Sequence, residues 1–171
     1  MIEIVTTGGT IDKVYFDANS EFEIGDSLVP ELLAEANIND DYVITGLLRK
    51  DSLEMTDEDR ERIATAVIAS PHRWMLITHG TDTMVQTAQA ITARMAEYKA
   101  LEPTQNPDKT VVLLGSMQPA RMRRSDAVFN LGFATAAVKL LPAGVYIAMN
   151  GEVFTAHSVH KNLKAQRFER L

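Results

Sequence analysis

The sequence contains no cysteine among its 171 residues. Disulfide bonds, thiolate metal sites, thiol redox chemistry and a cysteine nucleophile are therefore excluded, although cysteine content alone does not fix the cellular compartment. Long hydrophobic runs are also missing, because Gly, Pro, Thr or a charged residue interrupts each apolar stretch well before the ~20 residues needed to cross a bilayer. We expect a soluble protein that does not span a membrane.

The sequence also has no excess of basic over acidic residues. The formal net charge is -6, with 23 acidic and 17 basic residues, whereas proteins that hold nucleic acid or an anionic membrane need a basic face. A small-molecule substrate or a protein partner fits this balance better. The first residues, Met1–Val5, enter a strand-like pattern without the features of a signal peptide, which predicts a cytoplasmic protein.

The sequence does contain 46% hydrophobic residues, enough for the core of one domain at ~150 residues per domain. Five short runs rich in Val, Ile and Leu predict strands, and their continuous hydrophobicity is typical of parallel strands covered on both faces. We predict one three-layer αβα domain over residues 1–171, with a doubly wound, mostly parallel sheet of the flavodoxin-like or Rossmann-like kind. The predicted strands are Ile2–Val5, Tyr42–Leu48, Trp74–Ile77, Val111–Leu114 and Val145–Met149.

Three segments between these runs predict helices. Thr56 begins one as an N-cap, with Asp59 where a capping box places an acidic residue, and this helix ends near Ser70-Pro71. Residues 83–98 and 125–141 predict two more helices, each starting at a Ser or Thr cap.

Two irregular segments interrupt this pattern. Residues 12–26 lack clear periodicity and directly follow the first predicted strand, and ligands bind at the carboxyl ends of strands in open parallel sheets. We therefore predict that residues 12–26 form a flap over the active site. Residues 101–108 contain two prolines and predict an exposed turn into the fourth strand.

Three polar loops follow the first three predicted strands and should meet at one edge of the sheet. They contain Thr7-Gly8-Gly9-Thr10, Asp51-Ser52 and His79-Gly80-Thr81-Asp82-Thr83. Their glycines allow close backbone approach and leave amide groups to bind a carboxylate or an oxyanion, while the threonine hydroxyls supply nucleophiles. A threonine hydroxyl needs a neighbouring base or positive charge, for which Lys161 and Tyr15 are the candidates.

Each threonine loop also has a purely structural interpretation. The first could be a simple turn or a phosphate cradle, although the Walker lysine and the G-x-G-x-x-G spacing are absent. In the second, Thr83 could serve only as a helix cap, Asp82 only as a favourable charge at the helix N-terminus, and His79 as a side chain that supports the loop.

Taken together, the two threonine loops resemble the hallmarks of the bacterial-type L-asparaginase family. These are a Thr-Gly-Gly-Thr-Ile segment near the N-terminus, here Thr7–Ile11, and a His-Gly-Thr-Asp-Thr segment before a helix, here His79–Thr83. The resemblance covers essentially the whole chain, to near Phe168. Further agreement lies in Asp51-Ser52 with Met55-Thr56, in Gly115-Ser116-Met117 with Pro119, and in Ser125-Asp126 and Phe129-Asn130.

The resemblance implies a covalent mechanism without a metal or organic cofactor. Thr10 would attack the side-chain amide carbon of the substrate and form an acyl-enzyme, and Thr81, Asp82 and Lys161 would form a second cluster. In the family, the lysine lowers the cost of ionising the threonine, and the aspartate pairs with the lysine and with the substrate α-amino group. Ser52 would bind the substrate α-carboxylate. The other residues that we expect to bind substrate are Gly9, Gly80 and Ser116.

Three features depart from the family pattern. Tyr15 is the favoured flap tyrosine for activating Thr10, but the spacing in some members places Phe22 there, which has no hydroxyl. Leu53 follows Ser52 where many secreted members have a glutamine that helps to hold the α-amino group. The family usually has two domains, and this chain corresponds to the N-terminal catalytic domain without the C-terminal one, as a natural short form, a shortened version or a degenerate member.

Two other clusters are given structural interpretations. His157 and His160 would share one face of a helix, but they lack the H-E-x-x-H motif and a carboxylate partner, so no metal site is expected. Arg121, Arg123 and Arg124 form a basic cluster that predicts a solvated face or intersubunit salt bridges, with an acidic partner as the alternative.

The leading functional hypothesis is hydrolysis of L-asparagine to L-aspartate and ammonia. A second enzyme class is the amidase subunit of a tRNA-dependent amidotransferase, which the acidic charge disfavours. A different class is a weakly active or inactive sensor that binds asparagine or aspartate. We expect a homo-oligomer, a dimer or tetramer, whose subunits cover each other's sites.

Overall fold

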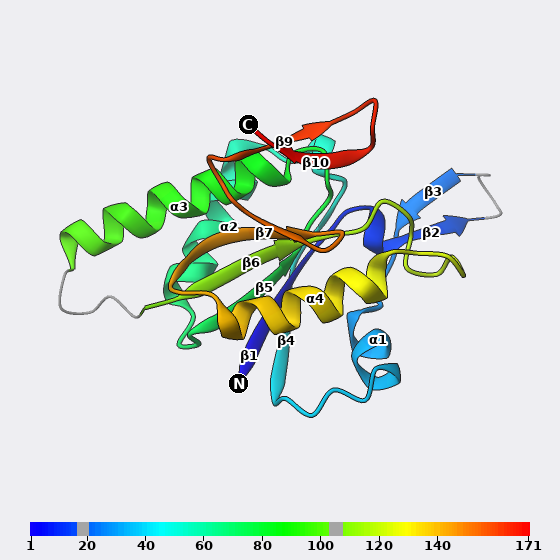
Figure 1. The fold of residues 1–171 in the computed structure, drawn as a ribbon, viewed down its shortest axis with the longest axis horizontal. Coiled ribbons are helices and arrows are strands. Elements are labelled where there is room, and N and C mark those ends of the chain that lie inside the picture. The colour runs from blue at the N-terminus through cyan, green and yellow to red at the C-terminus, as the bar shows by residue number, and fades with distance from the viewer. Residues whose placement is uncertain (17–20, 103–107) are drawn as a thin grey trace.

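The computed structural model describes residues 1–16, 21–102 and 108–171, and its centre is a six-stranded sheet (Figure 1). The strand order is β4-β1-β5-β6-β7-β8, in which the first five strands are parallel and β8 joins β7 antiparallel. All five predicted strands are present, and the predicted mostly parallel αβα fold is confirmed. The strands are β1 (Ile2–Gly8), β4 (Tyr42–Lys50), β5 (Trp74–Thr78), β6 (Thr110–Leu114), β7 (Gly144–Met149) and β8 (Glu152–Thr155).

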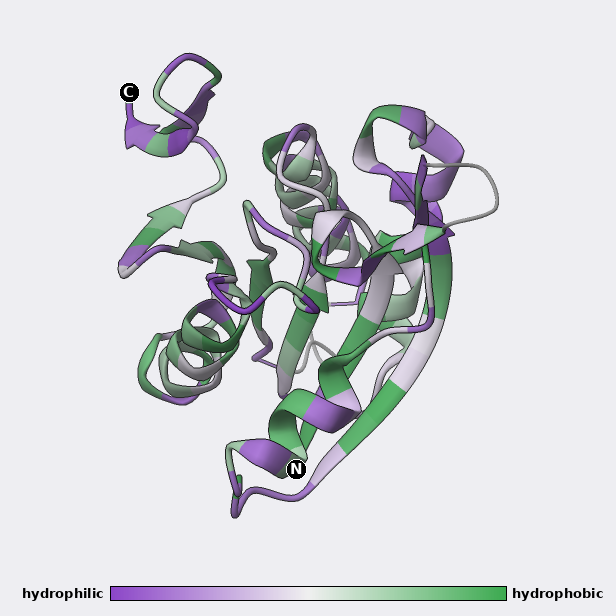
Figure 2. Ribbon diagram, turned by 90° about the vertical axis from the view of Figure 1, so that its right-hand side faces the viewer, coloured by the Kyte–Doolittle hydropathy of each residue, from purple (hydrophilic) through white to green (hydrophobic). Residues whose placement is uncertain are grey.

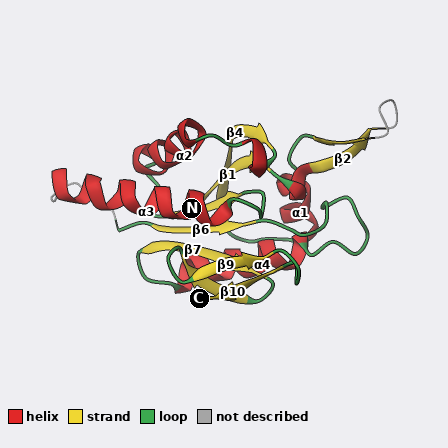
Figure 3. Cartoon of the chain, turned by 90° about the horizontal axis from the view of Figure 1, so that it is seen from above, coloured by secondary structure: helices red, strands yellow, loops and turns green. Residues whose placement is uncertain are grey.

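Helices cover both faces of this sheet (Figure 3). α2 and α3 bury Ile63 and Ile91 on one face, and α1 and α4 bury Leu33 and Leu131 on the other. The core therefore consists of two apolar clusters separated by the sheet, whose central strands appear mainly in green in Figure 2. The helices are α1 (Val29–Glu35), α2 (Asp57–Ala69), α3 (Met84–Leu101) and α4 (Ala127–Leu140).

The start of α2 confirms the predicted capping box. The Thr56 hydroxyl accepts a hydrogen bond from the Asp59 amide at 3.3 Å, and the Asp59 carboxylate accepts one from the Thr56 amide at 3.0 Å. α3 begins after Thr83 as predicted, but the Thr83 hydroxyl does not cap it. It donates instead to the carbonyl of Ser52 at 2.6 Å, so this threonine ties two loops together.

The outer strand β4 corrects one expectation. Most of its residues are exposed or half-buried, so the prediction that every strand is covered on both faces is wrong here. Among the described residues, β4 pairs only with β1. An edge strand needs less burial, which leaves room beside it for a surface cavity.

The segment predicted as an aperiodic flap contains a short hairpin of β2 (Lys13–Phe16) and β3 (Glu21–Ile24). Figure 1 shows this hairpin projecting from the body of the molecule. Residues 17–20 of the predicted flap, and 103–107 of the predicted turn at 101–108, lie outside the described residues.

The C-terminal part of the chain forms two hairpins that the apolar runs did not predict. The β7–β8 turn consists of Asn150 and Gly151, both with positive φ, of 50° and 89°. Asn-Gly is the preferred pair for such a turn, so the sequence did carry this signal. β9 (Val159–Asn162) and β10 (Arg167–Arg170) form the second hairpin. No helix within the described ranges is long and apolar enough to cross a membrane.

Candidate active site

The three predicted loops meet at the carboxyl ends of β4, β1 and β5, which are adjacent in the sheet. A Cβ atom added to Gly9 would lie only 2.3 Å from the amide nitrogen of Gly80. A Cβ atom on Gly80 would lie 2.5 Å from the hydroxyl oxygen of Ser52. Any side chain at either glycine would collide, so the loops that carry Thr10, Ser52 and Thr81 are in direct contact.

Thr10 lies at the turn that ends β1. Gly8 and Gly9 before it have φ values of 96° and 88°, a region that favours glycine because L-residues clash there. Thr10 then begins a single 3-10 turn, Thr10–Asp12, and Thr10 itself is half-buried. The glycines thus allow the chain to leave the sheet sharply and place Thr10 at the sheet edge.

Lys161 joins the second threonine loop from β9. Its ammonium Nζ donates to the Thr81 hydroxyl at 2.7 Å and to the Asp82 carboxylate at 2.6 Å. The Lys161 side chain is 13% exposed, so water screens this ion pair only partly. An ammonium group that contacts a hydroxyl favours its ionised form, and the aspartate keeps the lysine in place.

The β9–β10 hairpin positions this lysine. Phe168 lies opposite Lys161 in the hairpin, is buried, and packs against Phe154 with ring centroids 6.4 Å apart. The hairpin also contacts α3, which follows the Thr81 loop. Packing of the aromatic pair therefore brings together residues 80 positions apart.

Ser52 has an unusual hydroxyl. The residue is 1% exposed, and its Oγ has no hydrogen-bond partner among the described residues. A buried hydroxyl without a hydrogen-bond partner is energetically unfavourable. The Ser52 hydroxyl could therefore donate a hydrogen bond to an oxygen atom of a bound molecule. Its neighbour Asp51 accepts from the Lys13 ammonium at 2.6 Å. Burial would raise the pKa of Asp51, but the hydrogen bonds from Lys13 and Leu53 hold it below its usual value.

His79 supports the second loop, as predicted. It is fully buried, and burial lowers its pKa to about 4, so the ring is neutral near pH 7. Nδ1 lies 2.7 Å from the carbonyl oxygen of Gly80, which can only accept, and Nε2 lies 2.8 Å from the Thr87 hydroxyl. Nδ1 therefore carries the proton and Thr87 donates to Nε2, an anchor that the sequence analysis missed.

A loop after β6 packs behind the threonine cluster. A Cβ atom on Gly115 would lie 3.4 Å from the methyl carbon of Thr81. Ser116, predicted to bind substrate, is fully buried and donates its hydroxyl to the carbonyl of Gln118 at 2.5 Å. Its hydroxyl thus shapes its own loop in this structure.

Asp126 holds that loop in place. Its carboxylate accepts hydrogen bonds from the amide of Met117 at 3.0 Å, from Asn130 at 2.9 Å and from Asn150 at 3.1 Å. Asp126 is also the residue that precedes α4, so the predicted start of this helix at Ser125 is one residue early. The sequence pattern indicated Asp126 and Asn130 through the family resemblance but not the role of Asn150.

Tyr15 and Phe22, the two alternatives for the flap residue, face each other on the β2–β3 hairpin. Their rings meet edge to face with centroids 5.5 Å apart, and Tyr15 is 54% exposed. Among the described residues, Tyr15 makes no hydrogen bond to Thr10. The two positions are therefore neighbours in space, and only Tyr15 carries a hydroxyl.

The histidines near the C-terminus do not share a helical face. His157 lies in a turn and His160 in β9, 3.8 Å from the carboxylate of Glu169. Within the described part of the chain, no group of three or more histidine, aspartate or glutamate side chains is placed to hold a metal ion. Arg121, Arg123 and Arg124 are exposed.

Comparison with known proteins agrees with this fold. The family model described as "Asparaginase, N-terminal" matches residues 1–170. The chain is 35% identical to a probable periplasmic L-asparaginase of Haemophilus influenzae, covering 94% of this chain and 46% of that protein. It is 29% identical to a glutamyl-tRNA(Gln) amidotransferase subunit of Methanococcus vannielii, covering 97% of this chain and 38% of that protein.

A solved structure shows the same similarity. The L-asparaginase I structure from Vibrio cholerae superposes with a TM-score of 0.78 at 26% identity, covering 99% of this chain and 50% of that one. The chain belongs to the asparaginase family, whose members are typically amidohydrolases. It spans about half the length of the curated relatives that it matches.

Proposed function

We propose that the protein hydrolyses L-asparagine to L-aspartate and ammonia through a threonine nucleophile. The observation that carries this proposal is the lysine that donates to both the Thr81 hydroxyl and the Asp82 carboxylate, at 2.7 and 2.6 Å. Next to it, Gly80 contacts both Gly9 and Ser52. Adjacent loops thus offer a nucleophile and binding groups for an amino acid, and Lys161 of β9 adds the positive charge.

The proposed substrate pose uses polar groups that can still donate or accept a hydrogen bond. The Ser52 hydroxyl, buried without a partner among the described residues, donates to the substrate α-carboxylate. The Asp82 carboxylate accepts from the α-ammonium group with its second oxygen, since the first already accepts from Lys161. The amide of Gly80 is available for the oxyanion that develops on the side-chain carbonyl, whereas the amide of Gly9 already donates to the carbonyl of Lys50 at 3.0 Å.

The proposed reaction has two halves. The Thr10 oxygen bonds to the side-chain amide carbon, and its hydroxyl proton passes to the departing amide nitrogen, which leaves as ammonia. Water then attacks the acyl-enzyme ester, its oxygen bonds to the same carbon, and a proton returns to Thr10 as L-aspartate is released. Thr81, activated by Lys161, transfers protons and orients the water, and Tyr15 from the hairpin activates Thr10.

Alanine substitutions test this assignment. Thr10→Ala and Thr81→Ala should each abolish ammonia release from L-asparagine, because each removes a hydroxyl that the mechanism requires. Thr10→Ser should keep part of the activity, since it retains a nucleophilic oxygen. Thr65→Ala, at an exposed threonine of α2, is the matched control. Full activity in both alanine variants would exclude the mechanism.

Parallel substrates separate the alternatives. Ammonia release should be measured with L-asparagine, L-glutamine and misacylated tRNA, together with the affinity for L-aspartate. Turnover only in the presence of tRNA would support the activity named in the Methanococcus vannielii relative. Binding of L-aspartate with no turnover of any substrate would support the sensor hypothesis.

We also propose that residues 1–171 act as one catalytic domain of the N-terminal type and that the protein is a homo-oligomer. Exposed apolar side chains support association, since they gain stability when a partner covers them. They include Leu53, Phe129 and Leu163. Light scattering after size-exclusion chromatography should give the mass of a dimer or tetramer; a monomer at every concentration would contradict this.

A further inference from the structure

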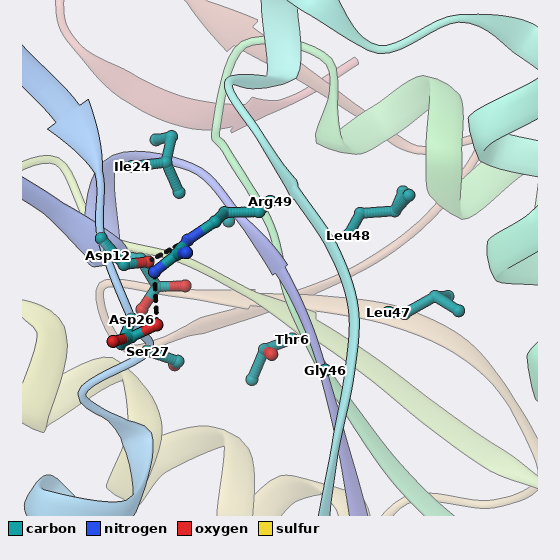
Figure 4. Close-up of a pocket in the computed structure, with 11 residues that line it drawn as sticks. Thr6, Asp12, Ile24, Asp26, Ser27, Gly46, Leu47, Leu48 and Arg49 are labelled. Atoms are coloured by element: carbon teal, nitrogen blue, oxygen red, sulfur yellow. Dashed lines mark hydrogen bonds and ion pairs between the residues drawn. The ribbon is translucent and has the colours of Figure 1, made fainter.

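A hollow lies beside the edge strand β4 (Figure 4). It has a volume of about 380 Å³, which lies in the range of small-molecule sites. Asp12, Asp26 and Ser27 form one wall, Arg49 reaches across from β4, and Thr6 and Gly46 line the opposite side. Thr10, Ser52, Thr81 and Asp82 do not line it.

Gly46 creates part of this space. It lies opposite Thr6 in the β1–β4 pair, and a Cβ atom on Gly46 would have only the Thr6 hydroxyl within 4 Å, at 3.8 Å. A side chain could therefore be accommodated without a backbone clash. The lack of a side chain at Gly46 therefore leaves this part of the hollow open.

Asp12 is the buried charge of the hollow. The residue is 3% exposed, yet its Oδ1 has no hydrogen-bond partner among the described residues. The carboxylate is otherwise supported by Ser27 and the Leu28 amide. Burial raises the pKa of Asp12 to about 6, so near pH 7.5 the group is mostly ionised despite its burial. A buried carboxylate oxygen of this kind calls for a positively charged hydrogen-bond donor.

The charges of the lining favour a cation. Oδ1 of Asp12 receives no hydrogen bond from Arg49, whose guanidinium pairs with Asp26 and whose Nε donates to the carbonyl of Gly25 at 3.0 Å. With Asp12 and Asp26 ionised against Arg49, the lining carries a net negative charge. Two carboxylates, one of them already paired, are too few ligands for a typical metal site.

We propose that this cavity binds a small primary ammonium compound, whose N–H groups donate to Oδ1 of Asp12. The compound replaces the partner that this carboxylate oxygen lacks, and its carbon chain occupies the space beside Gly46 and Ile24. The site adjoins the first threonine loop through Gly8 and Asp12 but does not include Thr10 or Thr81, and the proposal does not depend on the proposed activity.

Occupation of the cavity would affect the base of the flap. The amide of Asp12 donates to the carbonyl of Gly9 at 3.1 Å, and the carbonyl of Asp12 accepts from the amide of Gly25 at 2.8 Å. Asp12 therefore connects the turn that contains Thr10 with the end of the β2–β3 hairpin. A ligand that holds Asp12 would restrict both segments.

Titration of backbone amide NMR signals tests the proposal. n-Propylammonium chloride, added at constant ionic strength and pH 7.5, should give saturable shifts for Asp12, Gly25 and Gly46. Tetramethylammonium chloride carries the same charge without an N–H donor, so it should give no saturable shift. Asp12→Asn and Gly46→Leu should each raise the dissociation constant for n-propylammonium by about tenfold or more.

Matched controls make the result decisive. Gly132→Leu changes another glycine with open space around it, on the surface of α4, and should bind like the original protein. Unchanged affinity in Asp12→Asn, or equal binding of both ammonium salts, would overturn the proposal, as would the absence of saturable shifts. If Gly46→Leu does not fold, Asp12→Asn and the salt comparison decide alone. Binding is measured without turnover, so loss of the proposed activity would not affect the outcome.

Discussion

The two threonine loops differ in how firmly the folded chain holds them. Around Thr81 nearly every polar group has a partner: Lys161 contacts Thr81 and Asp82, Thr83 contacts Ser52, and the His79 ring is held by Thr87. Around Thr10 the neighbouring hairpin projects from the molecule (Figure 1), and the Tyr15 ring is half-exposed.

We propose that this difference reflects two tasks of one catalytic site. Preorganised charges lower a reaction barrier because they need not reorient during the reaction. A hairpin over the substrate must open for entry and close to exclude water, so it is anchored less firmly. We therefore expect the Thr81 side to be complete before substrate binds, and the Thr10 side to be completed by hairpin closure. The following experiments test that division.

The largest effect is expected for Lys161→Met, which removes the charge between Thr81 and Asp82. Ammonia release from L-asparagine should fall by about 10³-fold, since the threonine loses the group that stabilises its ionised form. Lys164→Met, at an exposed position of the same hairpin, is the control and should keep its activity. Equal loss in both variants would show that the hairpin fold, rather than the Lys161 charge, is what matters.

Tyr15→Phe tests the Thr10 side. Loss of its hydroxyl should lower kcat by about 10²-fold if Tyr15 activates Thr10 on closure. The double variant Tyr15→Phe/Phe22→Tyr moves the hydroxyl to the facing position. Recovery of activity in the double variant would show that a hydroxyl at position 22 can also reach Thr10; an unaffected kcat in Tyr15→Phe alone would remove the tyrosine from the mechanism.

Asp12→Asn tests the buried carboxyl below the Thr10 turn. The folded-state pKa of about 6 exceeds the usual 3.8, so the ionised group destabilises the fold above pH 6, and the penalty disappears as the pH falls toward 4. At pH 7.5 the variant should be more stable by about 3 kcal/mol, and the difference should shrink at pH 5. Urea unfolding at both pH values measures it, with the exposed Asp41→Asn as control; a difference independent of pH would refute the assignment.

Thr87→Val gives the smallest expected effect. It leaves Nε2 of the buried His79 without its donor, which should lower the unfolding free energy by about 1 kcal/mol and loosen the Thr81 loop. Thr92→Val is the control, because the Thr92 hydroxyl donates only within its own helix, to Ala88 at 2.8 Å. Thermal unfolding of both variants compares them, and equal losses would mean that the His79 contact adds nothing specific.

Much of the fold could be predicted because its signals are local. Apolar runs predicted all five parallel strands, and the capping box at Thr56 predicted the start of α2. The short hairpins were missed because each of their strands, β2, β3, β9 and β10, contains a charged residue and forms no continuous apolar run of four residues. The exposure of β4 was missed because strand order decides which strand lies at the edge.

The candidate site divides in the same way. The sequence by itself determined the two glycine-threonine loops and their positions after β1 and β5, since glycine spacing and strand ends are read along the chain. Only the tertiary structure decided that Lys161 donates to Thr81. It also decided that the Ser52 hydroxyl is buried beside Gly80 without a hydrogen-bond partner among the described residues. Finally, it decided that Asp12 lines a cavity and that one of its carboxylate oxygens has no hydrogen-bond partner among these residues. These features depend on which segments the sheet and hairpins bring together, because contact and burial are properties of the packed chain.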